Sequence, residues 1–145
     1  AGIGLLQLRK LKKMIDKRNK ISIKILNTAK KNSCFIAPIP SNEIKHAFYK
    51  CYIFINKIKL NREWTRNKII EYFNSKNIAC KSGACPEIYL EKAFTKIKLG
   101  PKKRLTNAKI LGETSLAFDI HPNMTIKQVN EISNEINLIA KLCTK

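Results

Sequence analysis

The sequence predicts a small α/β domain in which helices pack on a largely antiparallel sheet. Three observations lead to this fold class. Helix-like and strand-like segments alternate along the 145 residues, 44% of the residues are hydrophobic and 27% are charged, and no internal repeat occurs. A chain of this length buries one substantial core, so two full domains are excluded.

A long helix is predicted over residues 1–31, because apolar residues recur there at helical spacing while Lys and Arg fill the other faces. No capping residue precedes it, and the pattern is already under way at Ala1, which suggests a chain that has been cut. Residues 32–42 hold two prolines and are expected to form an extended connector. We therefore interpret residues 1–31 as a linking helix and residues 32–145 as the rest of a single domain.

The remaining elements follow from periodicity and from helix-start signals. Residues 46–56 are aromatic and β-branched with apolar groups on both parities, which predicts a strand covered on two sides. A short extended piece is predicted at 78–80 and a second full strand at 114–120. The other helices are expected at 61–76, from Pro86 through Phe94, at 105–111, and after a Thr125 cap along a stripe of Ile126, Val129, Ile132, Ile136 and Ile139.

The net charge of +19, from 29 Lys+Arg against 10 Asp+Glu, would by itself indicate a nucleic acid or an anionic membrane as partner. However, 24 of the basic residues are Lys and only 5 are Arg, the residue best suited to phosphate and guanine contacts. Lys, Ile and Asn are all abundant and all have A/T-rich codons, so nucleic-acid binding is not expected. With no apolar run near ~20 residues and no signal-peptide pattern, we expect a soluble cytoplasmic chain without a membrane partner.

The five cysteines are an odd number in a chain of this size, so free thiols are expected rather than a disulfide framework. Cys80 and Cys85, with His46 and His121, can in principle ligate zinc, but a second tight pair is missing and no metal site is expected. Cys85 precedes a predicted helix start, where a thiol can act as a nucleophile; a structural or gating role is favoured. No glycine-rich segment matches a phosphate-binding loop.

Residues 82–89 concentrate functional groups on one loop, where binding residues tend to lie. The segment SGACPEIY combines a flexible turn, a thiol, a helix start, a carboxylate and a phenol. The alternative interpretation is a capped junction between a loop and a helix.

Five blocks occur in a recognisable order: AGIGLLQLRKL at 1–11, IKHAFY at 44–49, SGACPEIYLEKAF at 82–94, RLTNA with LGETSL between 104 and 116, and His121-Pro122 before the last helix. Together they resemble the C-terminal part of the DegT/DnrJ/StrS sugar aminotransferases, which are fold-type I enzymes dependent on pyridoxal phosphate. This sequence differs from the family's pattern at only a few of these positions. Thr106 stands where one branch often has Pro, Ala84 where it often has Ser, and Asp119 in a strand position that is usually apolar.

The resemblance implies the α+β small domain of an enzyme that transfers an amino group, usually from glutamate, to a keto-sugar nucleotide. Such enzymes are homodimers and serve cell-surface polysaccharide or deoxysugar biosynthesis. In this family the Schiff-base lysine, the acidic partner of the pyridine nitrogen and the phosphate pocket lie in a large domain, ahead of the part represented here. The resemblance therefore assigns no catalytic, cofactor-binding or metal residue to this chain, which is expected to be inactive alone.

By the same resemblance, the residues expected to face the sugar substrate are His46, Tyr49, Ser82, Cys85, Glu87 and Tyr89. The basic loop at 102–104 can attract an anionic sugar diphosphate, although a solvated loop explains it equally well. Two alternatives to the aminotransferase function are a stand-alone basic module that binds RNA or another polyanion, and a degenerate gene remnant. In the isolated chain, the apolar stripe of helix 1–31 is expected to be exposed and to promote oligomerisation.

Overall fold

A four-stranded antiparallel sheet with the order β1-β2-β4-β3 forms the centre of the computed structural model, which describes residues 2–145. The strands are β1 (Phe35–Ile36), β2 (Lys50–Ile55), β3 (Cys80–Lys81) and β4 (Ser115–Asp119). The two longer strands lie side by side, with Cys51 of β2 opposite Phe118 of β4. This pairing confirms the predicted class of a small, mainly antiparallel sheet.

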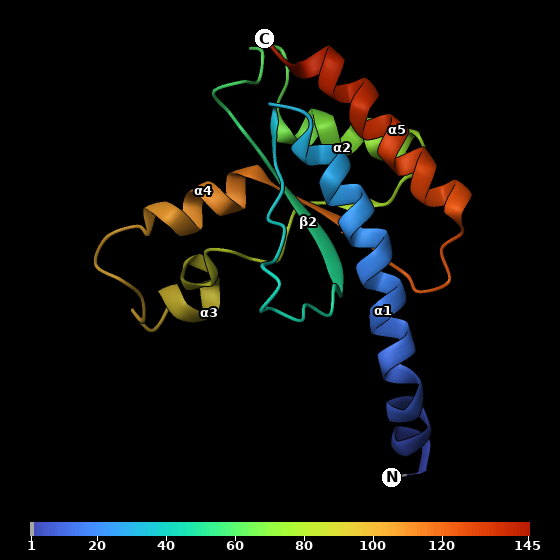
Figure 1. The fold of residues 1–145 in the computed structure, drawn as a ribbon. Coiled ribbons are helices and arrows are strands. Elements are labelled where there is room, and N and C mark those ends of the chain that lie inside the picture. Colours follow the sequence, from blue (N-terminus) through green and yellow to red (C-terminus); the bar gives the residue numbers. More distant parts are fainter. Residues whose placement is uncertain (1) are drawn as a thin grey trace.

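Helices cover the two faces of the sheet unequally (Figure 1). They are α1 (Gly2–Lys30), α2 (Arg66–Ser75), α3 (Lys92–Thr95), α4 (Thr106–Thr114) and α5 (Ile126–Cys143), with a 3-10 turn at Ile88–Leu90. α1, α2 and α5 gather on one face and bury the core, in which Phe73 of α2 meets Phe118 edge-on at 5.0 Å between ring centroids. α4 contacts β2 from the other side.

Only the C-terminal half of α1 belongs to this core. Its buried residues are Ile21, Ser22, Ile25, Leu26 and Ala29, and this half packs along α5 and the sheet. The N-terminal half extends past the sheet (Figure 1), and its exposed apolar residues are Ile3, Leu5, Leu6, Leu8 and Leu11. The predicted exposure of an apolar stripe is thus confirmed for this half, while the part of the prediction that concerns Ala1 lies outside the described residues. No described helix is long and apolar enough to cross a membrane.

The strand predicted over 46–56 starts later than expected. Phe48 has a φ of 43°, which is incompatible with extended backbone, and regular pairing begins only at Lys50. The predicted coverage on two sides is also only partly correct. Cys51, Ile53 and Ile55 are buried, whereas the alternate residues of the strand are half-buried, because the second face carries a loop and one short helix instead of three helices.

The single helix predicted from Pro86 through Phe94 is wrong, since Glu91 has extended backbone angles and separates the 3-10 turn from α3. Residues 32–42 include the short strand β1, which the proline content did not predict. Ile126, placed on the apolar stripe of the last helix, is 78% exposed because it lies in the first turn, outside the packed region. The rest of that helix is as predicted, including its Thr125 cap.

Candidate functional site

Residues 82–85 form a loop that is fixed on the half-buried face of the sheet. The Gly83 N–H donates to Ser115 Oγ at 3.1 Å, and the Ala84 N–H donates to the Tyr52 hydroxyl at 3.4 Å. A Cβ on Gly83 would lie 2.8 Å from Ser115 Oγ and 2.9 Å from Tyr52 Cε1, so a side chain here would require these side chains or the loop to shift. The loop is therefore held in place by its backbone, which leaves the side chains of Ser82 and Cys85 exposed.

Cys85 lies beside the carboxylate of Glu91. Its thiol donates to Glu91 Oε1 at 3.4 Å, and this hydrogen bond raises the pKa of Cys85. A raised pKa disfavours the thiolate, which is the nucleophilic form of cysteine. The geometry thus favours the non-nucleophilic interpretation of Cys85 that the sequence suggested.

The ring of Pro86, the residue that follows this loop, packs against α4. A Cβ on Gly112 would lie 2.3 Å from Pro86 Cγ, so the proline ring occupies the space above the glycine. The carbonyl of Gly112 accepts a hydrogen bond from Arg66 Nη1 at the start of α2. Through Gly112, α4 therefore contacts both Pro86 at the end of the loop and Arg66 at the start of α2.

Glu87 and Tyr89 are linked to the far end of the segment that follows them. Arg104 donates from Nε to Glu87 Oε1 at 2.7 Å and from Nη2 to Oε2 at 2.6 Å. The Tyr89 hydroxyl donates to Glu87 Oε1 at 2.7 Å and accepts from the Leu105 N–H at 3.0 Å. The Arg104 hydrogen bonds, followed by that of Tyr89, lower the pKa of Glu87 to about 2. We call Glu87, Tyr89 and Arg104 the polar brace.

His46 and Tyr49 lie at the start of β2, away from the brace. His46 Nδ1 accepts from the Phe48 N–H at 2.9 Å, and this bond supports the left-handed backbone of Phe48. The His46 carbonyl accepts from Asn19 Nδ2 of α1 at 2.8 Å. His46 and Phe48 line an apolar groove of about 510 Å³ on the outer face of β2, and Tyr49 beside it is 76% exposed.

The predicted site residues therefore form two clusters, one at the start of β2 and one on the loop with the brace. Within residues 2–145, no side chain of the 82–91 segment lines the groove that contains His46. Tyr52 joins the two clusters, because it lines this groove and its hydroxyl accepts from the loop. The sequence prediction missed Tyr52, and it placed Arg104 in a basic loop for the sugar diphosphate whereas the structure places it against Glu87. A signal for Tyr52 was available in the sequence. Side chains alternate along a strand, so Tyr52 points to the face opposite that of the buried residues Cys51, Ile53 and Ile55.

The cysteines considered as zinc ligands lie in different parts of the fold, as do the residues that depart from the family pattern. Cys80 is buried on β3 whereas Cys85 is exposed on the loop, and the part of the chain that the structure describes brings no three His, Cys, Asp or Glu residues into a metal-binding group. Asp119 forms a surface ion pair with Lys81 of the neighbouring strand at 3.2 Å, which explains a carboxylate in that strand position. Thr106 is the first residue of α4, a position that also accepts proline.

Solved aminotransferases share this fold. An aminotransferase from Psychrobacter cryohalolentis superimposes with a TM-score of 0.90 at 33% sequence identity, over 96% of this chain and 37% of that one. Helicobacter pylori PseC, an aminotransferase involved in the biosynthesis of pseudoaminic acid, has the same fold, with a TM-score of 0.79 at 17% identity over 96% and 36% of the two chains. An uncharacterized protein of Methanocaldococcus jannaschii is 30% identical over 142 residues, which is 96% of this chain and 35% of the relative.

The fold is that of the smaller part of an aminotransferase. The sequence pattern of the DegT/DnrJ/EryC1/StrS aminotransferase family matches residues 1–137, and the chain belongs to this family. The resemblance to the C-terminal small domain of these enzymes is thereby confirmed. The chain spans about a third of the length of the relatives that it matches.

Aminotransferases of this family depend on pyridoxal phosphate, but the residues of this chain do not fit that cofactor by themselves. Its formation of a Schiff base needs a lysine in an enclosed, desolvated site. All 24 lysines are exposed or half-buried in the structure, with Lys50 and Lys109 the two half-buried ones. No step of the reaction is therefore assigned to a lysine of the described chain.

Proposed function

We propose that this chain is the small domain of a pyridoxal-phosphate-dependent aminotransferase that transfers an amino group from glutamate to a keto-sugar nucleotide. Family membership over residues 1–137 is the observation that carries the proposal. The 33% identity with the Psychrobacter enzyme supports it. The proposed enzyme is a cytoplasmic homodimer in cell-surface polysaccharide or deoxysugar biosynthesis, and the isolated chain is inactive.

In this proposal the chain supplies a wall of the substrate site. The exposed side chains of His46, Tyr49, Ser82 and Cys85 contact the sugar, and Glu87 and Tyr89 act through the polar brace by keeping the loop in position. The bidentate contact with Arg104 supports this division, since it already occupies both oxygens of the Glu87 carboxylate. The exposed lysines at 102–103 attract the diphosphate of the substrate electrostatically.

Pyridoxal phosphate, when bound to the complete enzyme, supplies the electron sink for amino-group transfer. We assign its lysine, the partner of its ring nitrogen and its phosphate pocket to a large domain that this chain does not include. The small domain orients the sugar and excludes water from it.

The test is to join this chain to a large domain carrying a Schiff-base lysine, encoded upstream in the same frame or taken from the Psychrobacter relative. We expect glutamate-dependent amination of keto-sugar nucleotides by the joined protein and none by the chain alone. Tyr49→Ala should raise KM for the sugar nucleotide, whereas Ile58→Ala, at a 79% exposed position, is the matched control. A joined protein that folds and binds pyridoxal phosphate but aminates no keto-sugar nucleotide would contradict the proposal.

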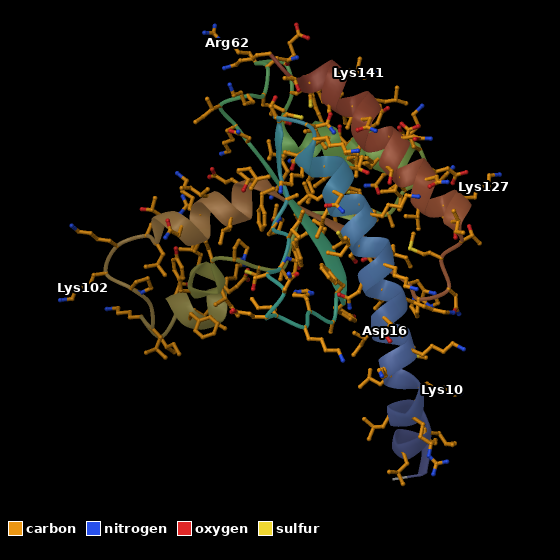
Figure 2. All side chains as sticks on the ribbon, viewed as in Figure 1. Lys10, Asp16, Arg62, Lys102, Lys127 and Lys141 are labelled. Carbon is orange, nitrogen blue, oxygen red and sulfur yellow. The ribbon has the colours of Figure 1, made fainter. Side chains whose placement is uncertain are left out.

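The net charge of +19 supports a second candidate function, the binding of RNA or another polyanion. The basic side chains labelled in Figure 2, Lys10, Arg62, Lys102, Lys127 and Lys141, come from four separate parts of the fold. In contrast, Arg9, Lys12, Lys13, Lys17 and Lys20 lie together along α1. RNA binding that weakens steeply with salt, and weakens further in Lys102→Glu/Lys103→Glu, would favour the second function.

A further inference from the structure

Cys34 and Cys143 form a buried pair of thiols that brings together the two ends of the core. Cys34 lies between α1 and β1, and Cys143 is the last residue of α5, 109 positions later. Their sulfur atoms are 3.7 Å apart, and both side chains are 0% exposed. The two thiols are therefore in direct contact in the folded chain.

Main-chain hydrogen bonds hold both cysteines against the same short segment that follows β2. The Asn56 N–H donates to the Cys34 carbonyl at 2.8 Å, and the Asn61 N–H donates to the Cys143 carbonyl at 2.8 Å. A disulfide requires a sulfur separation of about 2.0 Å. The sulfurs thus need to approach by less than about 2 Å, from positions that the backbone already fixes as neighbours.

The hydrogen bond between the thiols also makes them chemically unequal. Cys143 donates to Cys34, and this bond lowers the pKa of Cys34 while it raises the pKa of Cys143. In contrast, burial raises the pKa of both Cys51 and Cys80 to about 12. Among the four buried thiols, Cys34 is therefore the one whose pKa is lowered, which favours its thiolate form.

We propose that Cys34 and Cys143 are a redox-sensitive site that forms a disulfide with a peroxide as the oxidant. The Cys34 thiolate attacks the peroxide: an S–O bond forms to give a sulfenic acid, the O–O bond breaks, and the released hydroxide takes up a proton and leaves as water. The Cys143 sulfur then attacks the Cys34 sulfur: the S–S bond forms, the S–O bond breaks, and the hydroxyl group leaves with the Cys143 proton as a second water. The two sulfurs lose two electrons and the two thiol protons end in water, so one S–S bond replaces two S–H bonds.

The disulfide would tie the end of α5 to the junction between α1 and β1. Because it closes a loop that contains most of the chain, it would restrict the unfolded state strongly. We expect the melting temperature to rise by roughly 5–15 °C on oxidation and to return on reduction. This proposal does not depend on the aminotransferase function, since it concerns the stability of the domain.

The test uses the whole chain with Cys85→Ser, which removes the exposed thiol. The reduced protein is exposed to hydrogen peroxide, unfolded, and alkylated, and its peptides are analysed by mass spectrometry. We expect two of the four remaining thiols to escape alkylation and the linked peptides to contain Cys34 and Cys143. Four alkylated thiols, a different linked pair, or a sulfinic acid on Cys34 instead of a link would overturn the proposal.

Cys51 and Cys80 provide a matched control pair. Both lie opposite Phe118, on the two strands that flank β4, so they are separated by roughly 10 Å and cannot form a bond. The melting temperature of each variant is measured with and without peroxide, and the two values are compared, so that differences in starting stability between variants cancel. The oxidation-dependent rise should persist in Cys51→Ala/Cys80→Ala and disappear in Cys34→Ala and in Cys143→Ala. A rise that persists in Cys34→Ala would show that another change is responsible.

Discussion

Arg104 and Glu87, 17 positions apart in the sequence, are joined by two parallel hydrogen bonds of 2.7 Å and 2.6 Å. The segment that they enclose contains the 3-10 turn and α3, and neither of these described elements buries a residue in the core. A segment whose apolar residues are at most half-buried gains less from the hydrophobic effect than the core does. Its conformation therefore depends on the polar brace, which makes this contact the natural place to perturb the candidate site.

The Glu87→Gln variant should change the acid dependence of stability. The pKa of Glu87 is about 2 in the folded chain and 4.5 without its partners, so the folded state favours the ionised carboxylate. Its contribution to stability is complete above pH 4.5 and is lost as the pH falls through about 2. We expect melting temperatures measured by circular dichroism over this range to fall less steeply in Glu87→Gln than in the wild type. Glu71→Gln, on the exposed face of α2, is the control, and equal slopes for Glu87→Gln and wild type would show that the brace contributes nothing.

Gly112→Ala should destabilise the chain although alanine is the better helix former. The new Cβ would lie 2.3 Å from Pro86 Cγ, and a proline ring cannot rotate away. Overpacking of this kind costs about 1–3 kcal/mol, against a helix-propensity gain of about 1 kcal/mol at most. Urea unfolding measures the difference. Gly4→Ala, where nothing lies within 4 Å, should be neutral or slightly stabilising; a stabilised Gly112→Ala would mean that the loop does not pack on α4.

Thr125→Ala should weaken the start of α5. Thr125 Oγ1 accepts from the Gln128 N–H at 3.2 Å, and Gln128 Oε1 accepts from the Thr125 N–H at 2.9 Å. Loss of such a capping residue costs about 1 kcal/mol. Thr125→Ser keeps the hydroxyl and should retain most of the stability in urea unfolding. If the serine variant loses as much stability as the alanine variant, the threonine methyl group and not the hydrogen-bonded cap accounts for the loss.

Leu5→Gln/Leu8→Gln should reduce self-association of the isolated chain. Both leucines are exposed on the half of α1 that extends past the sheet. A contiguous apolar surface of this kind promotes association in water. Sedimentation velocity should show oligomers for the wild type and a shift toward monomer for the double variant. Ile58→Gln/Ile126→Gln, at exposed positions elsewhere, should leave the oligomers unchanged, and a monomeric wild type would contradict the prediction.

Local patterns predicted much of the fold. The Thr125 cap and the period of the residues after it predicted α5, and the apolar run at 114–120 predicted β4 to within one residue at each end. α2 ends at Ser75, within one residue of the predicted end at 76. These signals succeed because each acts within one or two turns of the chain.

The candidate site was predicted less completely. The ordered sequence blocks indicated the family and the residues at 82–89, and the family match confirms the first of these. The sequence did not indicate that Glu87 is bound by Arg104, or that Tyr52 holds the loop. The helix expected from Pro86 is interrupted at Glu91, whose backbone is extended.

The sequence by itself determined the fold class, the family and the order of most elements, because periodicity, caps and ordered motifs are local properties. Only the tertiary structure decided which distant groups meet: Glu87 with Arg104, Pro86 with Gly112, and Cys34 with Cys143. The physical reason is that such contacts depend on how the sheet and helices place residues that are far apart in the chain.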